Sequence, residues 1–136
     1  IIFLQLNFFG DRIIGYITVG TNDLNRSIAF YDALMGAVGI RQLWAHGNMA
    51  AWGETRNDVA FCVATPFDGE EATVGNGSMI ALKMKDRDAV DKIHAKALEL
   101  GGDDEGAAGP RGDHGFYGGY FRDLDGNKLN AYVAGS

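Results

Sequence analysis

Residues 14–36, IGYITVGTNDLNRSIAFYDALMG, predict a β-strand that leads directly into an α-helix. The strand covers residues 15–19, where β-branched and aromatic side chains are concentrated. Asp23 offers a side-chain oxygen to the unpaired backbone N–H groups of the first helical turn, which is the role of an N-cap. Before Gly36, the helix presents one apolar face, made by Leu24, Ile28, Tyr31 and Met35.

A second unit of the same kind follows at an offset of 63 residues, since Ile17 aligns with Ile80 (80 − 17) and the cap Asp23 with Asp86 (86 − 23). Its strand covers residues 79–82. The apolar face of its helix is made by Val90, Ile93, Ala97 and Leu98. Two strand-then-helix units at a fixed spacing indicate an internal duplication.

Short strand-like runs follow each helix. They cover residues 41–46, 49–52 and 59–65 in the first half, and 117–122 and 128–133 in the second. The last two runs flank Asp125-Gly126, a dipeptide that readily adopts the positive φ angles of a two-residue hairpin turn. Each half therefore reads β-α-β-β-β, which predicts an α+β fold.

The domain organisation follows from this duplication. We predict a first βαβββ module at residues 13–65 and a second at 78–136. Residues 66–77, PFDGEEATVGNG, are typical of a linker because proline, glycine and acidic residues punctuate them. Residues 1–12 are interpreted as an N-terminal extension or a cloning remnant.

The composition restricts the partners. The chain has 136 residues, 46% of them apolar, with 12 Lys and Arg against 18 Asp and Glu, and this length suits one domain with its own core. A net charge of −6 without a basic cluster disfavours nucleic acid and anionic membranes. No apolar run approaches the roughly 20 residues of a membrane-spanning helix. Cys62 is the single cysteine, so we expect no intrachain disulfide and a reducing, cytoplasmic location.

Two stretches resemble a known family. Residues 14–36 are similar to the opening, and residues 120–133, YFRDLDGNKLNAYV, to the closing hairpin, of the vicinal oxygen chelate superfamily of glyoxalases, bleomycin resistance proteins and dioxygenases. The resemblance covers residues 13–134. It implies two four-stranded sheets that curl into an open, barrel-like cleft with the helices outside, and it implies a homodimer.

The resemblance also locates four positions that hold a divalent metal in metal-using relatives. In this chain they fall at Tyr16, Cys62, Met79 and Asn130. Because this set contains neither imidazole nor carboxylate, it is a poor match for a hard divalent ion. We therefore expect no cofactor, while a divalent metal bound through other ligands stays open.

The histidines and the cysteine are the remaining candidates for chemistry. His94 is interpreted as a packing residue on the second helix. His46, at the end of a short strand, and His114, in a glycine-rich stretch, are interpreted as solvated residues within reach of the cleft rim. Tyr16 and Asp113-His114 are alternative candidates for an acid–base group. Cys62 is interpreted as a small buried apolar residue rather than a nucleophile.

Strand alternation predicts which side chains face the cleft, because residues two apart share a face. A two-residue turn at Asp125-Gly126 would pair residue 121 with residue 130 and place Tyr117 and Phe121 on the cleft face. Trp52 is a further candidate, with its direction unassigned. The predicted ligand-binding residues are Tyr16, Trp52, Cys62, Met79, Lys83, Tyr117, Phe121, Lys128 and Asn130.

These residues favour a binding protein that sequesters a drug or metabolite, as bleomycin-type resistance proteins do. The alternative is a glyoxalase-like lyase or isomerase, or a dioxygenase, that acts on a small carbonyl or aromatic substrate. A structural homodimer with a vestigial cleft is a third hypothesis. The charge of the ligand stays open, because the net charge of −6 favours a cation whereas Lys83 and Lys128 favour an anion.

Overall fold

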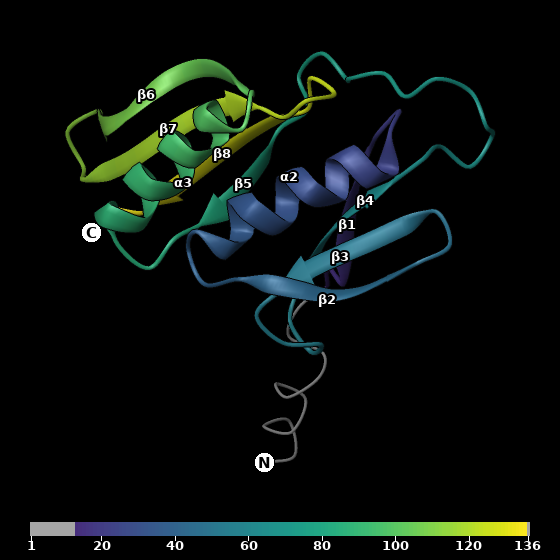
Figure 1. The fold of residues 1–136 in the computed structure, drawn as a ribbon. Coiled ribbons are helices and arrows are strands. Elements are labelled where there is room, and N and C mark those ends of the chain that lie inside the picture. Colours follow the sequence, from purple (N-terminus) through teal and green to yellow (C-terminus); the bar gives the residue numbers. More distant parts are fainter. Residues whose placement is uncertain (1–12, 136) are drawn as a thin grey trace.

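The structure, a computed structural model, describes residues 13–135. It contains two four-stranded sheets, each covered on one face by a single helix (Figure 1). The predicted α+β fold with two βαβββ modules is confirmed. The predicted extension at residues 1–12 lies outside the described part of the chain.

The first module begins with β1 (Tyr16–Gly20) and α2 (Leu24–Gly36), followed by β2 (Arg41–His46), β3 (Met49–Gly53) and β4 (Ala60–Ala64). Its sheet has the order β1-β4-β3-β2, with β1 parallel to β4 and the other pairs antiparallel. Helix α2 starts where predicted, because Asp23 Oδ1 accepts a hydrogen bond from the backbone N–H of Arg26 at 3.0 Å.

The second module repeats this plan with β5 (Ile80–Lys83), α3 (Arg87–Glu99), β6 (Asp103–Arg111), β7 (Phe116–Arg122) and β8 (Lys128–Val133). The sheet order is β5-β8-β7-β6, and Asp86 caps α3 through the N–H of Ala89 at 2.9 Å. The sequence analysis did not locate β6. Its residues DDEGAAGPR are poor in strand-forming types, but β6 lies at the sheet edge, where glycine and proline are tolerated.

The pairing of β7 with β8 differs from the prediction by one residue. Phe121 lies opposite Leu129, and Tyr120 opposite Asn130. The cause is the turn, which spans the five residues 123–127 and not two. Asp123 Oδ1 accepts hydrogen bonds from the backbone N–H groups of Asp125 and Asn127, each at 2.9 Å. Because alternate residues face opposite sides, a one-residue slip exchanges the two faces of β7.

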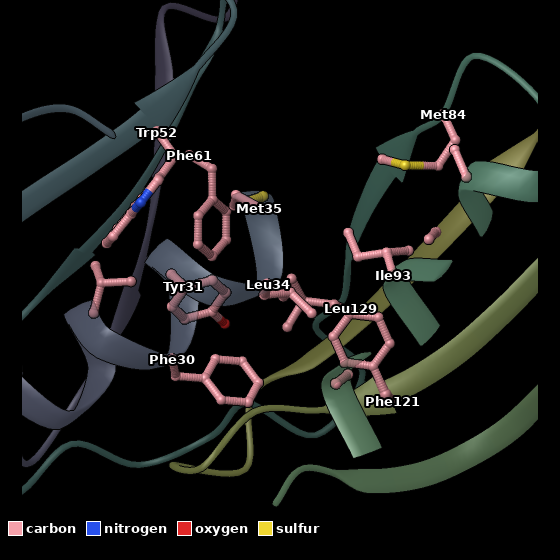
Figure 2. Close-up of a cluster of buried hydrophobic side chains, with 14 of the residues drawn as sticks. Phe30, Tyr31, Leu34, Met35, Trp52, Phe61, Met84, Ile93, Phe121 and Leu129 are labelled. Carbon is pink, nitrogen blue, oxygen red and sulfur yellow. The ribbon is translucent and has the colours of Figure 1, made fainter. Parts of the chain in front are cut away.

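One continuous core joins the two modules (Figure 2). Leu34 of α2 lies between the aromatic group of the first module and the apolar residues of the second. The aromatic group is built around Tyr31, whose ring centroid lies 4.8 Å from that of Phe61 and 5.5 Å from that of Trp52. The second module contributes Ile93, Phe121 and Leu129, each fully buried.

The sheets of the two modules do not pair with each other. Among the described elements, α2 and α3 are the only pair from different modules whose Cα atoms come within 8 Å. Strands β1 and β5 are therefore both edge strands within one chain. No helix between residues 13 and 135 has the length and apolar character needed to cross a bilayer.

Candidate functional site

The two sheet faces turned away from the helices form the candidate site, and we call them the cleft faces. Phe61 and Leu129 belong to the core under the helices, so Cys62 and Asn130, one position along each strand, point the other way. Tyr16 and Cys62 thus lie on the first sheet and Asn130 on the second, with Met79 just before β5. The strands of one chain do not bring these four residues into a single cluster.

On the first sheet, the cleft face is built from small and aromatic side chains. Cys62 pairs with Thr18 on one side and with Ala51 on the other, and Trp44 lies opposite Ala51. Trp44 stacks on His46, with ring centroids 4.9 Å apart and an interplanar angle of 27°. Cys62 is fully buried, and this burial raises the pKa of its thiol. Tyr16 is 65% exposed.

This geometry predicts that the Cys62 thiol is unreactive. Thiol reagents attack the thiolate, which both burial and a raised pKa suppress. We expect 5,5′-dithiobis(2-nitrobenzoate) to react with the native protein at least ~100-fold more slowly than with the unfolded chain. A Cys62→Ala, Ala64→Cys double variant moves the thiol two residues along the same strand face, to a half-buried position, and should react faster. Rapid labelling of native Cys62 would contradict the assignment.

On the second sheet, the cleft face is aromatic and cationic. Phe116 and Tyr132 stack with centroids 5.5 Å apart and rings 6° from parallel. Two cations lie near the Tyr120 ring: Lys128 Nζ is 5.7 Å from its centroid, and the guanidinium of Arg111, a residue of β6, is 5.6 Å from it. Phe116 and Tyr120 were missed by the sequence analysis because of the slipped register. The available signal was their spacing of four residues on one strand, which places both side chains on the same face.

Three of the predicted ligand-binding residues lie on the helix side. The placement of Tyr117 and Phe121 on the cleft face is wrong for the register reason given above. The Tyr117 hydroxyl donates to Asp91 Oδ1 of α3 at 2.7 Å, a bond that raises the pKa of the phenol. Phe121 is fully buried in the core. Trp52 is also buried beneath α2, where its Nε1–H donates to Asp32 Oδ1 at 2.9 Å.

The segment between β4 and β5 walls two hollows beside the cleft faces. One, of about 690 Å³, lies between residues 74–79 and the side chains of Arg122 and Lys128. The other, of about 510 Å³, lies between residues 65–73 and the β1 residues Thr18 and Gly20. Both are within the 300–1,000 Å³ range of small-molecule sites.

The charge on the cleft face of the second sheet is opposite in sign to the net charge of the chain. Its strands carry Lys83, Arg111, Arg122 and Lys128, with the acidic Asp103 opposite Arg122. The carboxylate of Glu105 pairs with Arg122 at 3.3 Å, and Arg111 donates to the carbonyl of Ala107. An excess of positive charge remains on a chain of net charge −6, so this face attracts anions locally.

The residues present do not fit a divalent metal site. Tyr16, Cys62, Met79 and Asn130 supply a phenol, a thiol, a thioether and a carboxamide. The Asn130 amide already donates to the carbonyls of Ala131 at 3.2 Å and Gly119 at 3.4 Å. In the described part of the chain, no three His, Cys, Asp or Glu side chains are grouped to hold a metal.

The histidines are distributed over unrelated environments. His94 is buried, and its Nε2 lies 3.1 Å from Asp104 Oδ1 and 3.2 Å from the Tyr120 carbonyl oxygen, so it packs as predicted. The pKa of Asp104 is lowered by the N–H of Gly106 and by His94. His114 is exposed in the turn between β6 and β7. Tyr16 lies on the other sheet, so one chain does not join these two candidate acid–base groups.

Comparisons with known proteins agree with this architecture. The family model of the Glyoxalase/Bleomycin resistance protein/Dioxygenase superfamily matches residues 13–131. A glyoxalase/bleomycin resistance protein from Albidiferax ferrireducens T118 is 33% identical, with a TM-score of 0.81 over 90% of this chain and 98% of that one.

More distant structures share the fold. A putative glyoxalase from Bacillus halodurans is 17% identical, with a TM-score of 0.71 over 93% of this chain and 99% of that one. A lactoylglutathione lyase from Agrobacterium tumefaciens is 19% identical, with a TM-score of 0.65 over 90% of this chain and 92% of that one. None of the curated proteins matches this chain significantly.

Proposed function

The chain belongs to the Glyoxalase/Bleomycin resistance protein/Dioxygenase superfamily, and from this membership we propose that it is a homodimeric protein that binds and sequesters a small planar anion, a drug or a metabolite. The observation that carries the proposal is the aromatic and cationic cleft face of the second sheet. The Phe116–Tyr132 stack and Tyr120 offer π faces to a planar ligand. Lys128, beside Tyr120, is placed to pair with its charge.

The way the sheets end supports the proposed dimer. Among the described strands, β1 and β5 each lie at the end of a sheet and pair with one neighbour, and such edges are normally protected in native proteins. Tyr16 and Met79, which are equivalent in the duplication, are 65% and 42% exposed beside these edges. In a twofold dimer, β1 of each copy would meet β5 of the other. Each cleft would then combine the first sheet of one copy with the second sheet of its partner.

Binding, rather than catalysis, is what the side chains support. The donor set fits no divalent metal, and the thiol of Cys62 is buried and protonated at neutral pH because its pKa is raised. The charge of Lys128 would stabilise a bound anion, and the Tyr120 ring beside it would add an aromatic surface. Sequestration needs only this affinity.

Native mass spectrometry and titration calorimetry test the proposal, on untagged protein purified without chelators or metal resin. We expect a dimer, and we expect 2-naphthoate to bind at least tenfold more tightly than 2-naphthylmethylammonium, which has the same ring system and the opposite charge. A monomer, or an equal affinity for both probes, would refute the proposal. So would turnover of a catechol or of the methylglyoxal–glutathione adduct that Tyr16→Phe abolishes.

A further inference from the structure

Two cations lie opposite each other in the middle of the second sheet. Arg122 of β7 pairs with Lys128 of β8, and these are the two central strands in the order β5-β8-β7-β6 (Figure 1). Both side chains line the hollow of about 690 Å³, and none of the described residues around it is acidic. Like charges directly opposite each other destabilise a sheet. An anion bound between these two side chains would remove the repulsion.

The chain places one carboxylate of its own against this pair. Glu105 Oε2 lies 3.3 Å from Arg122 Nε. The register of β6 shifts between Asp104 and Gly106, so Glu105 is the extra residue of a β-bulge. Bulges beside functional sites commonly change the direction of a side chain. The bulge explains how the edge strand β6 presents this carboxylate to Arg122.

The bulge is held by contacts that do not use the Glu105 carboxylate. Asp104 Oδ1 accepts a hydrogen bond from the backbone N–H of Gly106 at 2.9 Å. The same oxygen lies 3.1 Å from Nε2 of His94, on the helix side of the sheet. Glu105 can therefore lose its charge, or its partner, while the backbone of β6 keeps its shape.

The ion pair between Glu105 and Arg122 is weakly held. The two side chains are 33% and 31% exposed, and partly exposed pairs contribute little to stability. Within residues 13–135, the guanidinium donates one hydrogen bond, from Nη1 to the Gly126 carbonyl at 2.8 Å. Arg122 is therefore oriented without Glu105, and its Nη2 is left to donate to an oxyanion.

We propose that Arg122 and Lys128 together bind the anionic group of the ligand, and that Glu105 is a built-in competitor that occupies Arg122 when no ligand is bound. This inference rests on the proposed function and narrows the ligand to a planar aromatic acid. Its ring would lie on Tyr120, two residues from Arg122 on the same face of β7. Its carboxylate would replace that of Glu105, since guanidinium binds carboxylates through paired N–H groups.

Glu105→Gln is expected to bind 2-naphthoate about three- to tenfold more tightly than the parent protein, because the ligand no longer has to displace a carboxylate. Titration calorimetry at fixed ionic strength measures the change. A gain in affinity is informative, since damage to the fold would lower it. The matched control is Asp103→Asn, which removes the same charge from the same strand. Asp103 is exposed opposite Arg122 but forms no ion pair with it within residues 13–135, so its loss should change the affinity less than about twofold.

A double-mutant cycle tests whether Glu105 acts through Arg122. Arg122→Gln alone should weaken binding of 2-naphthoate roughly tenfold. Glu105→Gln in this background should give no gain, because the group for which the two carboxylates compete is gone. Circular dichroism of each variant checks that the fold is retained.

The outcomes separate this inference from the proposed function. If the parent binds 2-naphthoate and Glu105→Gln binds it no more tightly, the competitor role is wrong and the proposed function stands. Equal gains in Glu105→Gln and Asp103→Asn, or a gain that persists in the Arg122→Gln background, would also overturn the inference. Absence of binding to both the parent and Glu105→Gln refutes the proposed function together with it. If Arg122→Gln does not fold, the comparison of Glu105→Gln with Asp103→Asn decides.

Discussion

Asp123→Ala is expected to lower the free energy of unfolding by about 3–5 kcal/mol, because it leaves several hydrogen-bond donors without their acceptor at once. The Asp123 side chain is buried and accepts hydrogen bonds from the Tyr31 hydroxyl, from two backbone N–H groups of its own turn and from the Asn127 amide. Burial and this carboxylate raise the pKa of the Tyr31 phenol well above its usual range, so the phenol stays a neutral donor. Urea unfolding followed by circular dichroism measures the loss.

Asp113→Ala is the matched control, since Asp113 is exposed in the turn between β6 and β7. It should change stability by less than about 0.5 kcal/mol. A loss below 1 kcal/mol for Asp123→Ala would contradict the role given to the turn. If Tyr31→Phe lowers the free energy of unfolding as much as Asp123→Ala does, the effect belongs to the Tyr31–Asp123 hydrogen bond alone and not to the whole turn.

The fold was predictable because its signals are local and occur twice. The two Asp caps, the apolar helix faces and the alternation along β4 and β8 each follow from neighbouring residues, and the offset of 63 doubles the evidence. Edge strand β6 escaped detection because its glycines and proline violate strand preferences that an edge does not enforce. Sequence patterns alone do not reveal which strands lie at an edge.

The candidate site was predictable only in part, since it depends on strand register. The family resemblance assigned Cys62 and Asn130 to the cleft, and alternation along the same strand as Asn130 added Lys128. The placement of Tyr117 and Phe121 depended on the length of the turn between β7 and β8. The Asp-Gly pair suggested a turn of two residues, whereas the Asp123 carboxylate organises a turn of five. The cross-strand partners could have indicated the correct register, because apolar Phe121 pairs better with apolar Leu129 than with polar Asn130.

Equivalent positions of the two modules show how a duplicated chain acquires different contacts. The same backbone plan carries Thr21 and Tyr31 in the first module and Met84 and His94 in the second. Thr21 and Tyr31 donate to the carboxylates of the 123–127 turn, whereas Met84 has no hydroxyl group and His94 bonds to Asp104 of its own module. Substitution at a few equivalent positions is therefore enough to replace a contact between the modules by a contact within one.

Lys128→Glu is expected to weaken binding of 2-naphthoate by about 2–3 kcal/mol, or roughly 30- to 160-fold. The ammonium group of Lys128 lies over the Tyr120 ring on the cleft face, where a planar anion would meet both an aromatic surface and a positive charge. Reversal of this charge removes an attractive contact and adds a repulsive one. Titration calorimetry at fixed ionic strength gives the change in Kd, since salt screens such pairs.

Lys92→Glu separates this local effect from the net charge. Lys92 is exposed on α3, on the opposite side of the second sheet from the cleft face, and its reversal changes the total charge by the same amount. Lys92→Glu should alter the affinity for 2-naphthoate less than about threefold, because residue 92 and the bound anion are far apart and salt screens their interaction. Equal losses in both variants would mean that the anion responds to the overall field of the protein. An unchanged Kd for Lys128→Glu would place the ligand away from β8, and the cleft face of the second sheet would lose its assignment as the binding surface.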